Sequence, residues 1–309
     1  MRQDTNITLQ ATKTKALNIQ VSAFANETAL IEDCTRMCED FKAGKVNAVQ
    51  EETMRKLTGG DYNDDGRQWY GDGVNSYADA VGLFSNGYTK HINAVKAAFD
   101  SAKSCAPTVT RGLFYAGACP CVPAVLAGRP RNMHTQVVNV HNRVISVYVD
   151  VCASASVGAA QLEAASTQIA AYIGGLQKAG YSVNVHVFNV TLQRGGDNNY
   201  SVLDLKVKDA NARANISRFM FPLCHPSYLR VFEFIQACCN KHWQGVRFGL
   251  GSPLAHETDA LNIIKAILPA GALYLSAQAI INGKDIKTQI DALNAADAYK
   301  VKAGAPCRP

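Results

Sequence analysis

The stretch Arg143-Val-Ile-Ser-Val-Tyr-Val-Asp150-Val-Cys152-Ala-Ser154-Ala-Ser156 decides the fold. Its first half is a run of mostly apolar, β-branched residues, which predicts a buried strand. The strand delivers an aspartate, a thiol and hydroxyls into a loop that precedes a strong helical pattern. Open α/β sheets bind their ligands at the loops that follow the carboxyl ends of strands. We therefore expect a ligand site in the loop around residues 150–156.

The chain that follows predicts a parallel crossover. Residues 158–179 have apolar side chains on one helical face, and Gly180 stands just past the last helical residue, where glycine commonly ends a helix. Residues 181–190 and 200–208 read as strands separated by a short Gly- and Asn-rich loop. A strand, a helix and a strand favour a right-handed crossover with parallel pairing. The short loop favours antiparallel pairing of the last two strands.

Helices and strands continue to alternate toward the C-terminus. The predicted helices cover residues 209–219, 228–240, 252–268 and 284–299, and the predicted strands cover 246–250 and 272–277. The fold class is therefore α/β, with a mixed sheet flanked by helices.

The sequence as a whole predicts three regions. Residues 1–103 form a helical N-terminal region with a polar leading segment over 1–20, and residues 104–136 form a connector rich in Pro, Gly and Cys. Residues 137–309 form the α/β domain. Within the connector, a short helix is expected over 122–127. Residues 137–140 read either as a hairpin with 143–150 or as an edge strand before it.

Composition limits the classes of function. Apolar residues make up 48% and charged residues 18%, which is typical of a globular protein. The net charge of +6 comes from scattered side chains, so it permits nucleic-acid binding without indicating it. No segment approaches the roughly 18 apolar residues that span a bilayer, and the N-terminus has no signal-peptide pattern. We expect a soluble protein that stays in the cytoplasm where it is made, with its oligomeric state open.

The ten cysteines carry no C-x-x-C zinc spacing. Buried, reduced thiols that pack as small hydrophobic side chains explain most of them. A zinc site built from Cys119, Cys121 and a distant histidine is the alternative.

Two levels of resemblance follow from these residues. The order strand, Asp-x-Cys-x-Ser, helix, strand, strand resembles a von Willebrand factor type A domain, which has a Rossmann-like sheet. The set Trp69/Gly71, Pro123…Gly128-x-Pro130, Asp150 and Phe221-Pro-x-x-His225-Pro-Ser227-x-x-Arg230 resembles a family of uncharacterised phage and prophage proteins, over about residues 65–270. The resemblance implies a virus-encoded soluble protein with an A-domain-like core, and it implies no established activity.

The A-domain resemblance also implies a metal site. The family signature Asp-x-Ser-x-Ser holds magnesium, a hard cation that prefers oxygen ligands. Asp150 and Ser154 match it, whereas Cys152 replaces the first hydroxyl with a sulfur that is a poor ligand for magnesium. Asp209 is the expected later ligand, with Asp204, Glu257 and Asp259 as alternatives. In the competing interpretation the pocket is degenerate and Asp150 caps the next helix.

Four further residues are candidates for a binding surface: Cys152, Ser156, His225 and Arg230. Cys224 and His225 could form a nucleophile pair. A His-Pro-Ser stretch is more typical of a helix entry in which the imidazole packs or caps.

Three classes of function follow. The leading one is a protein-interaction module that binds a phage or host protein through the loop 150–156. The second is a virion structural or assembly component. The third is a hydrolase-like enzyme that uses Asp150 with a metal, or Cys152 as a nucleophile.

Overall fold

The computed structural model is a mixed α/β structure. It describes residues 2–10, 16–46, 48, 51–59, 62, 69–90, 92–101, 109–117, 119–138, 144–154, 156–192, 199–212, 216–239 and 260–291. Within these residues, no helix is long and apolar enough to cross a membrane.

Six strands form the central sheet, in the order β1-β2-β8-β7-β6-β9. They are β1 (Arg2–Gln10), β2 (Ala16–Phe24), β6 (Val144–Asp150), β7 (Ser182–Leu192), β8 (Asn199–Lys208) and β9 (Leu273–Ser276). Strand β6 pairs in parallel with both β7 and β9. Strand β7 pairs antiparallel with β8, β8 pairs in parallel with β2, and β2 pairs antiparallel with β1.

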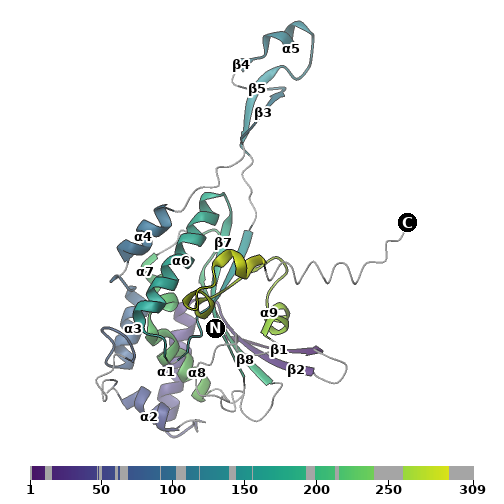
Figure 1. Cartoon of the computed structure of the whole chain (residues 1–309). Coiled ribbons are helices and arrows are strands. Elements are labelled where there is room, and N and C mark those ends of the chain that lie inside the picture. The colour runs from purple at the N-terminus through teal and green to yellow at the C-terminus, as the bar shows by residue number, and fades with distance from the viewer. Residues whose placement is uncertain are drawn as a thin grey trace.

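Most of the helices cover one face of this sheet (Figure 1). They are α1 (Glu27–Lys42), α2 (Glu51–Gly59), α3 (Tyr77–Asn86), α4 (Ile92–Ser101), α6 (Ala159–Lys178), α7 (Ile216–Cys224), the π-helix η1 (Tyr228–Glu233) and α8 (Phe234–Cys239). The opposite face packs its aromatic residues Tyr148, Phe188 and Tyr274 in a second core with α9 (Ala260–Ile267). The short helix α10 (Ala277–Ile281) follows β9 directly.

The order of the strands reverses at β6. Helix α6 leads from β6 to β7 across one face, whereas β9, on the other side of β6, is preceded by α9 on the opposite face. Such a reversal opens a crevice at the carboxyl ends of the two strands, and this is where open α/β sheets bind ligands. The loop 150–156 follows the carboxyl end of β6, where this reversal occurs.

A second, small sheet extends away from the main body (Figure 1). It consists of β3 (Val109–Phe114), β4 (Cys119–Pro120) and β5 (Met133–Val138) in the order β3-β5-β4, with helix α5 (Val122–Leu126) between β4 and β5. We refer to residues 109–138 as the arm.

The N-terminal segment departs from the prediction. Residues 2–10 and 16–24 are strands of the main sheet and not a polar lead into a helix. Strand β1 pairs on one side with β2 and is mostly exposed, so it needs no apolar face. Residues 22–57 of the predicted helical N-terminal region are divided between the end of β2, α1 and α2.

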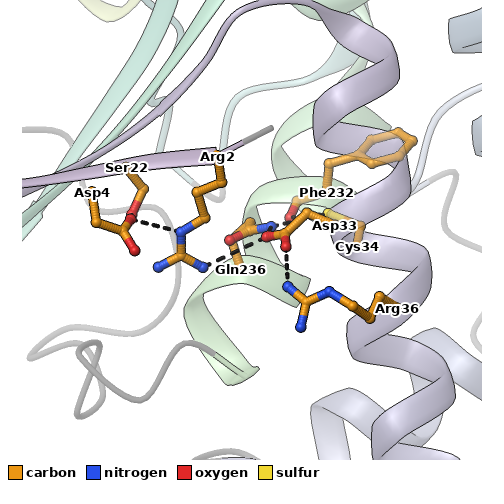
Figure 2. Close-up of polar contacts among 8 residues, drawn as sticks. All are labelled: Arg2, Asp4, Ser22, Asp33, Cys34, Arg36, Phe232 and Gln236. Atoms are coloured by element: carbon orange, nitrogen blue, oxygen red, sulfur yellow. Dashed lines mark hydrogen bonds and ion pairs between the residues drawn. The ribbon is translucent and has the colours of Figure 1, made fainter.

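Polar contacts fix this segment to the helices. The Arg2 guanidinium lies 3.5 Å from an Asp33 carboxylate oxygen on α1, and the Gln236 side-chain amide of α8 donates to the same carboxylate at 2.9 Å (Figure 2). Arg36 pairs with the other Asp33 oxygen. The described residues on both sides of the connector therefore contribute to one sheet and one core.

The connector itself contains regular structure. Residues 133–138 pair within the arm and not with β6, so neither a hairpin nor an edge strand beside 143–150 is formed by them. The short helix expected over 122–127 is confirmed as α5. It lies in the Pro- and Gly-rich stretch because Pro123 occupies the first turn, where its missing N–H costs nothing.

The predictions for the crossover are confirmed, whereas the helix predicted over 209–219 is observed later in the chain, as α7. Helix α6 joins two parallel strands, β7 and β8 are antiparallel, and Gly180 has a φ of 88° just past α6. The predicted strand 246–250 and the ligand alternatives Glu257 and Asp259 lie outside the described residues.

Candidate functional site

The Asp150 carboxylate at the end of β6 points into the protein. Its side chain is 1% exposed. One oxygen accepts a hydrogen bond from the Cys152 backbone N–H at 2.9 Å, and the other accepts from the Tyr274 hydroxyl at 3.0 Å. Burial raises the pKa of this carboxyl to about 7, and the two hydrogen bonds oppose the rise. The group therefore fixes the start of the loop and joins β6 to β9.

The expected metal ligands are not brought together. Strand β8 runs opposite to β6, and Lys208 pairs beside Val185, so Asp209 follows β8 at the sheet edge away from Asp150. Asp204 lies within 2.8 Å of His186 across the β7–β8 pair. No cluster of three His, Cys, Asp or Glu side chains among the described residues could hold a metal.

The residues around the loop therefore do not fit a magnesium ion. Asp150 already accepts two hydrogen bonds and Cys152 is fully buried. Among the described side chains of the loop, Ser154 and Ser156 are the ones that offer accessible oxygens. Two hydroxyls without a carboxylate form a weak site for a hard cation.

Cys152 is not a reactive thiol. Burial raises its pKa well above the usual range, and the nearby Asp150 and Glu233 carboxyls add to the effect. A thiol that stays protonated is a poor nucleophile. Cys152 therefore packs as a small apolar residue, and the same holds for the other buried cysteines, Cys34, Cys38, Cys224, Cys238 and Cys239.

Cys119 and Cys121 lie on the arm. Cys119 pairs in register with His134, but no three-ligand zinc group forms within the described residues. The described cysteines are all free thiols.

The second half of the loop presents hydroxyls at the surface. The Ser154 backbone N–H donates to the side-chain oxygen of Gln278 on α10 at 2.8 Å. The Ser154 and Ser156 hydroxyl oxygens lie 3.1 Å apart, and Ser156 is exposed. The loop therefore has a fixed backbone and a small polar surface.

His225 is a packing residue. Its ring nitrogens bond the Ser227 hydroxyl at 2.6 Å and the Asp72 carbonyl oxygen at 3.1 Å. The ring stacks on Phe221 and meets Tyr88 edge-on. Burial lowers the pKa of His225 to about 4, so the imidazole is neutral at pH 7.

A nucleophile pair with Cys224 is not formed. The Cys224 thiol is buried and donates to the Met220 carbonyl oxygen at 2.9 Å. The helix-entry interpretation of the His-Pro-Ser stretch agrees with these contacts.

Arg230 connects Val157, just after the loop 150–156, with Trp69 in the N-terminal half of the chain. Its guanidinium lies 3.8 Å from the centroid of the Trp69 ring and donates to the Trp69 carbonyl oxygen. A second nitrogen donates to the Val157 carbonyl oxygen at 3.1 Å. Burial lowers the pKa of Arg230 to about 10, so it keeps its charge at pH 7. Arg230 therefore supports the end of the loop after β6 from the protein interior, and it is not a surface ligand because it is buried.

Trp69 and Gly71, which belong to the motif set that resembles the phage and prophage proteins, lie next to its other members Arg230 and His225. Gly71 has a φ of 86°, and a Cβ at this position would lie 2.8 Å from the His225 ring. Trp69 and Gly71 therefore pack on Arg230 and His225, respectively.

A buried acid was missed by the sequence reasoning. Glu233 of η1 is 1% exposed and accepts a hydrogen bond from the Asn189 side-chain amide of β7. Three buried side-chain atoms have no hydrogen-bond partner among the described residues: the second carboxyl oxygen of Glu233, the side-chain amide oxygen of Asn189 and the Tyr228 hydroxyl. Burial raises the pKa of Glu233 to about 8, and the Asp150 carboxyl contributes. The sequence signal is slight: one acid within the apolar run 228–237.

Comparison with known proteins identifies a family whose function is unknown. No curated protein and no solved structure matches the chain. A family model described as "Domain of unknown function (DUF7192)" matches residues 20–288, which include the whole loop after β6 and its supporting helices. The chain belongs to the DUF7192 family.

Proposed function

We propose that this chain is a protein-interaction module with a von Willebrand factor A-like core, and that it binds its partner through the loop 150–156. One observation supports this most strongly. Hydrogen bonds fix the backbone of the loop and of Val157 just after it at three points, while Ser154 is partly exposed and Ser156 is exposed. Asp150 fixes Cys152, Gln278 fixes Ser154, and Arg230 fixes Val157. Loops held by a rigid scaffold are the usual carriers of binding residues.

The strand arrangement supports the A-like core. The motif strand β6 is followed by a helix, a parallel neighbour and an antiparallel strand, in the order that the resemblance implied. The motif resemblance to phage and prophage proteins supports a partner that is encoded by the phage or met in its host.

Binding is favoured over catalysis because the reactive groups of the loop face inward. The Asp150 carboxyl and the Cys152 thiol are both buried and hydrogen-bonded or packed within the protein. Ser154 and Ser156 have no histidine or carboxylate hydrogen bond that would activate a hydroxyl in the described residues.

A photo-crosslinking amino acid at position 156 tests the proposal in cells that produce the full chain. We expect an adduct with a different protein. We expect Ser154→Arg to abolish this adduct, because the large, positively charged arginine side chain would cover the same surface. The matched control places the crosslinker at exposed Asn93 on α4. If positions 156 and 93 give the same adducts, the loop is not the binding surface.

Magnesium titration tests the enzymatic alternative directly. We expect calorimetry to show no binding heat for the wild type. Stoichiometric binding of magnesium that disappears in Asp150→Asn would mean that the Asp150 carboxyl is available to a metal. It would support the metal-dependent enzyme instead.

A further inference from the structure

The arm exposes large apolar side chains that the rest of the fold does not. Tyr115 is 69% exposed, Val122 61% and Leu126 83%, and Val125 is also exposed. Across the part of the chain that the structure describes, the one further large hydrophobic side chain in this class is Val144, at the start of β6. Apolar side chains gathered on one projecting element commonly mark an interaction site.

These side chains do not form a core for the arm. Among the arm side chains whose burial the structure describes (residues 113, 115–117 and 119–134), Ala124 is the apolar one that is buried. Two or three short strands are marginally stable without an apolar face packed on another element. The arm therefore leaves its hydrophobic surface available for another molecule.

The charge of the arm has one sign. Residues 109–138 contain Arg111, Arg129 and Arg131, and they contain no Lys, Asp or Glu. The Arg131 guanidinium lies 5.3 Å from the centroid of the Tyr115 ring. Protein–protein interfaces are enriched in Arg and aromatic residues and depleted in Lys, Glu and Asp. The arm has this composition, with a positive charge that is complementary to an acidic partner.

Other occupants fit less well. Two arms from two copies would bring arginines of like charge together, and the described body offers no exposed large hydrophobic side chain beyond Val144 to receive an arm. A lipid surface is usually bound by longer amphipathic helices rich in Lys as well as Arg, whereas α5 has five residues and the arm has no Lys. Nucleic acid is bound chiefly through cations on phosphates, and the most exposed side chain here is a leucine.

We propose that the arm inserts Val122, Val125 and Leu126 into an apolar groove on another protein, and that acidic side chains at the rim of this groove pair with Arg129 and Arg131. This surface is distinct from the loop 150–156. The arm precedes β6 and the loop follows it, so they lie beyond opposite ends of a seven-residue strand that is itself roughly 20 Å long.

A random-peptide display library, selected on the immobilised full chain, tests the proposal. Peptides that also bind the Val122→Ser/Leu126→Ser variant are removed, and the affinity of a synthetic copy of each remaining peptide is measured by fluorescence anisotropy. We expect peptides with net negative charge and at least two large apolar residues. The double variant should weaken their binding at least tenfold, because two buried aliphatic contacts are lost.

Charge reversal gives an independent readout. Arg129→Glu/Arg131→Glu should also weaken the acidic peptides at least tenfold and remove the dependence of their affinity on salt. The control Asn93→Ser changes an exposed residue of α4 and should leave the affinity unchanged. Circular dichroism confirms that each variant keeps the body folded.

Four outcomes would overturn the proposal. They are the absence of any arm-dependent peptide, arm-dependent peptides without acidic residues, arm-dependent binding of phosphatidylglycerol vesicles or of a DNA duplex, and an arm-dependent dimer in equilibrium sedimentation. None of them bears on the crosslink at position 156, so failure of this proposal and failure of the proposed function are distinguishable.

Discussion

The buried acid Glu233 makes the stability of the protein depend on pH. Its pKa rises from an ordinary value of 4.5 to about 8 in the folded protein. Between these values the folded protein holds a proton that the unfolded chain releases, so the free energy of unfolding falls as pH rises. The stabilising contribution is complete below pH 4.5 and is lost by about pH 8.

Replacing Glu233 by Gln removes the contribution of Glu233 to this dependence, whereas Asp150, whose pKa burial raises to about 7, keeps its own. One pKa unit corresponds to about 1.4 kcal/mol, so Glu233 accounts for a loss of about 3 to 4 kcal/mol between pH 5 and pH 8. Glutamine keeps an oxygen to accept from the Asn189 amide. Its own amide can donate to the Asn189 oxygen that has no described partner. At pH 8 the Glu233→Gln variant should therefore be the more stable protein.

Urea unfolding followed by circular dichroism at pH 5, 6, 7 and 8 measures the effect. The gap between variant and wild type should widen in favour of the variant as pH rises. Glu32→Gln on α1 is the matched control, because Glu32 is exposed and its replacement should leave the wild-type curve unchanged. Parallel pH curves for wild type and Glu233→Gln would refute the reasoning, since they would mean that Glu233 is ionised in the folded protein across this range.

Two further substitutions test the packing around the site. Gly71→Ala should lower stability by about 2 to 4 kcal/mol because it combines a positive φ with a clash on His225; Gly73→Ala, with a φ of 77° and open space, should cost about 1 kcal/mol. Equal melting temperatures for the two variants would contradict the clash. Asp33→Ala should cost about 2 kcal/mol because it removes the acceptor of the Gln236 amide, and a thermal shift below 1 °C would show that this network adds nothing.

The motif strand and its neighbours could be predicted because their signals are local. The apolar run before Asp150 marks a buried strand, and Gly180 marks the end of the following helix. Strand β1 could not be predicted in the same way, because it is a mostly exposed edge strand whose apolar alternation is limited to Ile7 and Leu9. Strand β2 does alternate, with Leu17 and Ile19 buried, but its pattern runs directly into the helical pattern of α1.

The loop after β6 could be placed at the carboxyl end of a strand from the sequence, but the contacts of its side chains could not be predicted. The spacing of Asp150 and Ser154 suggested metal ligands, yet the direction of a side chain depends on its tertiary partners, and Tyr274 lies 124 residues away. Asp209 was excluded by the direction of β8, which a sequence pattern does not specify. Glu233 was missed because periodicity does not distinguish a buried acid from one acid on a solvated face.

The pairing of β2 with β8 also affects how the chain folds during its synthesis. Strand β2 ends at Phe24 and its parallel partner ends at Lys208, so a ribosome must extend the chain by more than 180 residues before the two can meet. Until then β2 is an unpaired edge that a neighbouring nascent chain could join. Contacts this distant in sequence slow folding, and the N-terminal hairpin should be among the last elements to become protected.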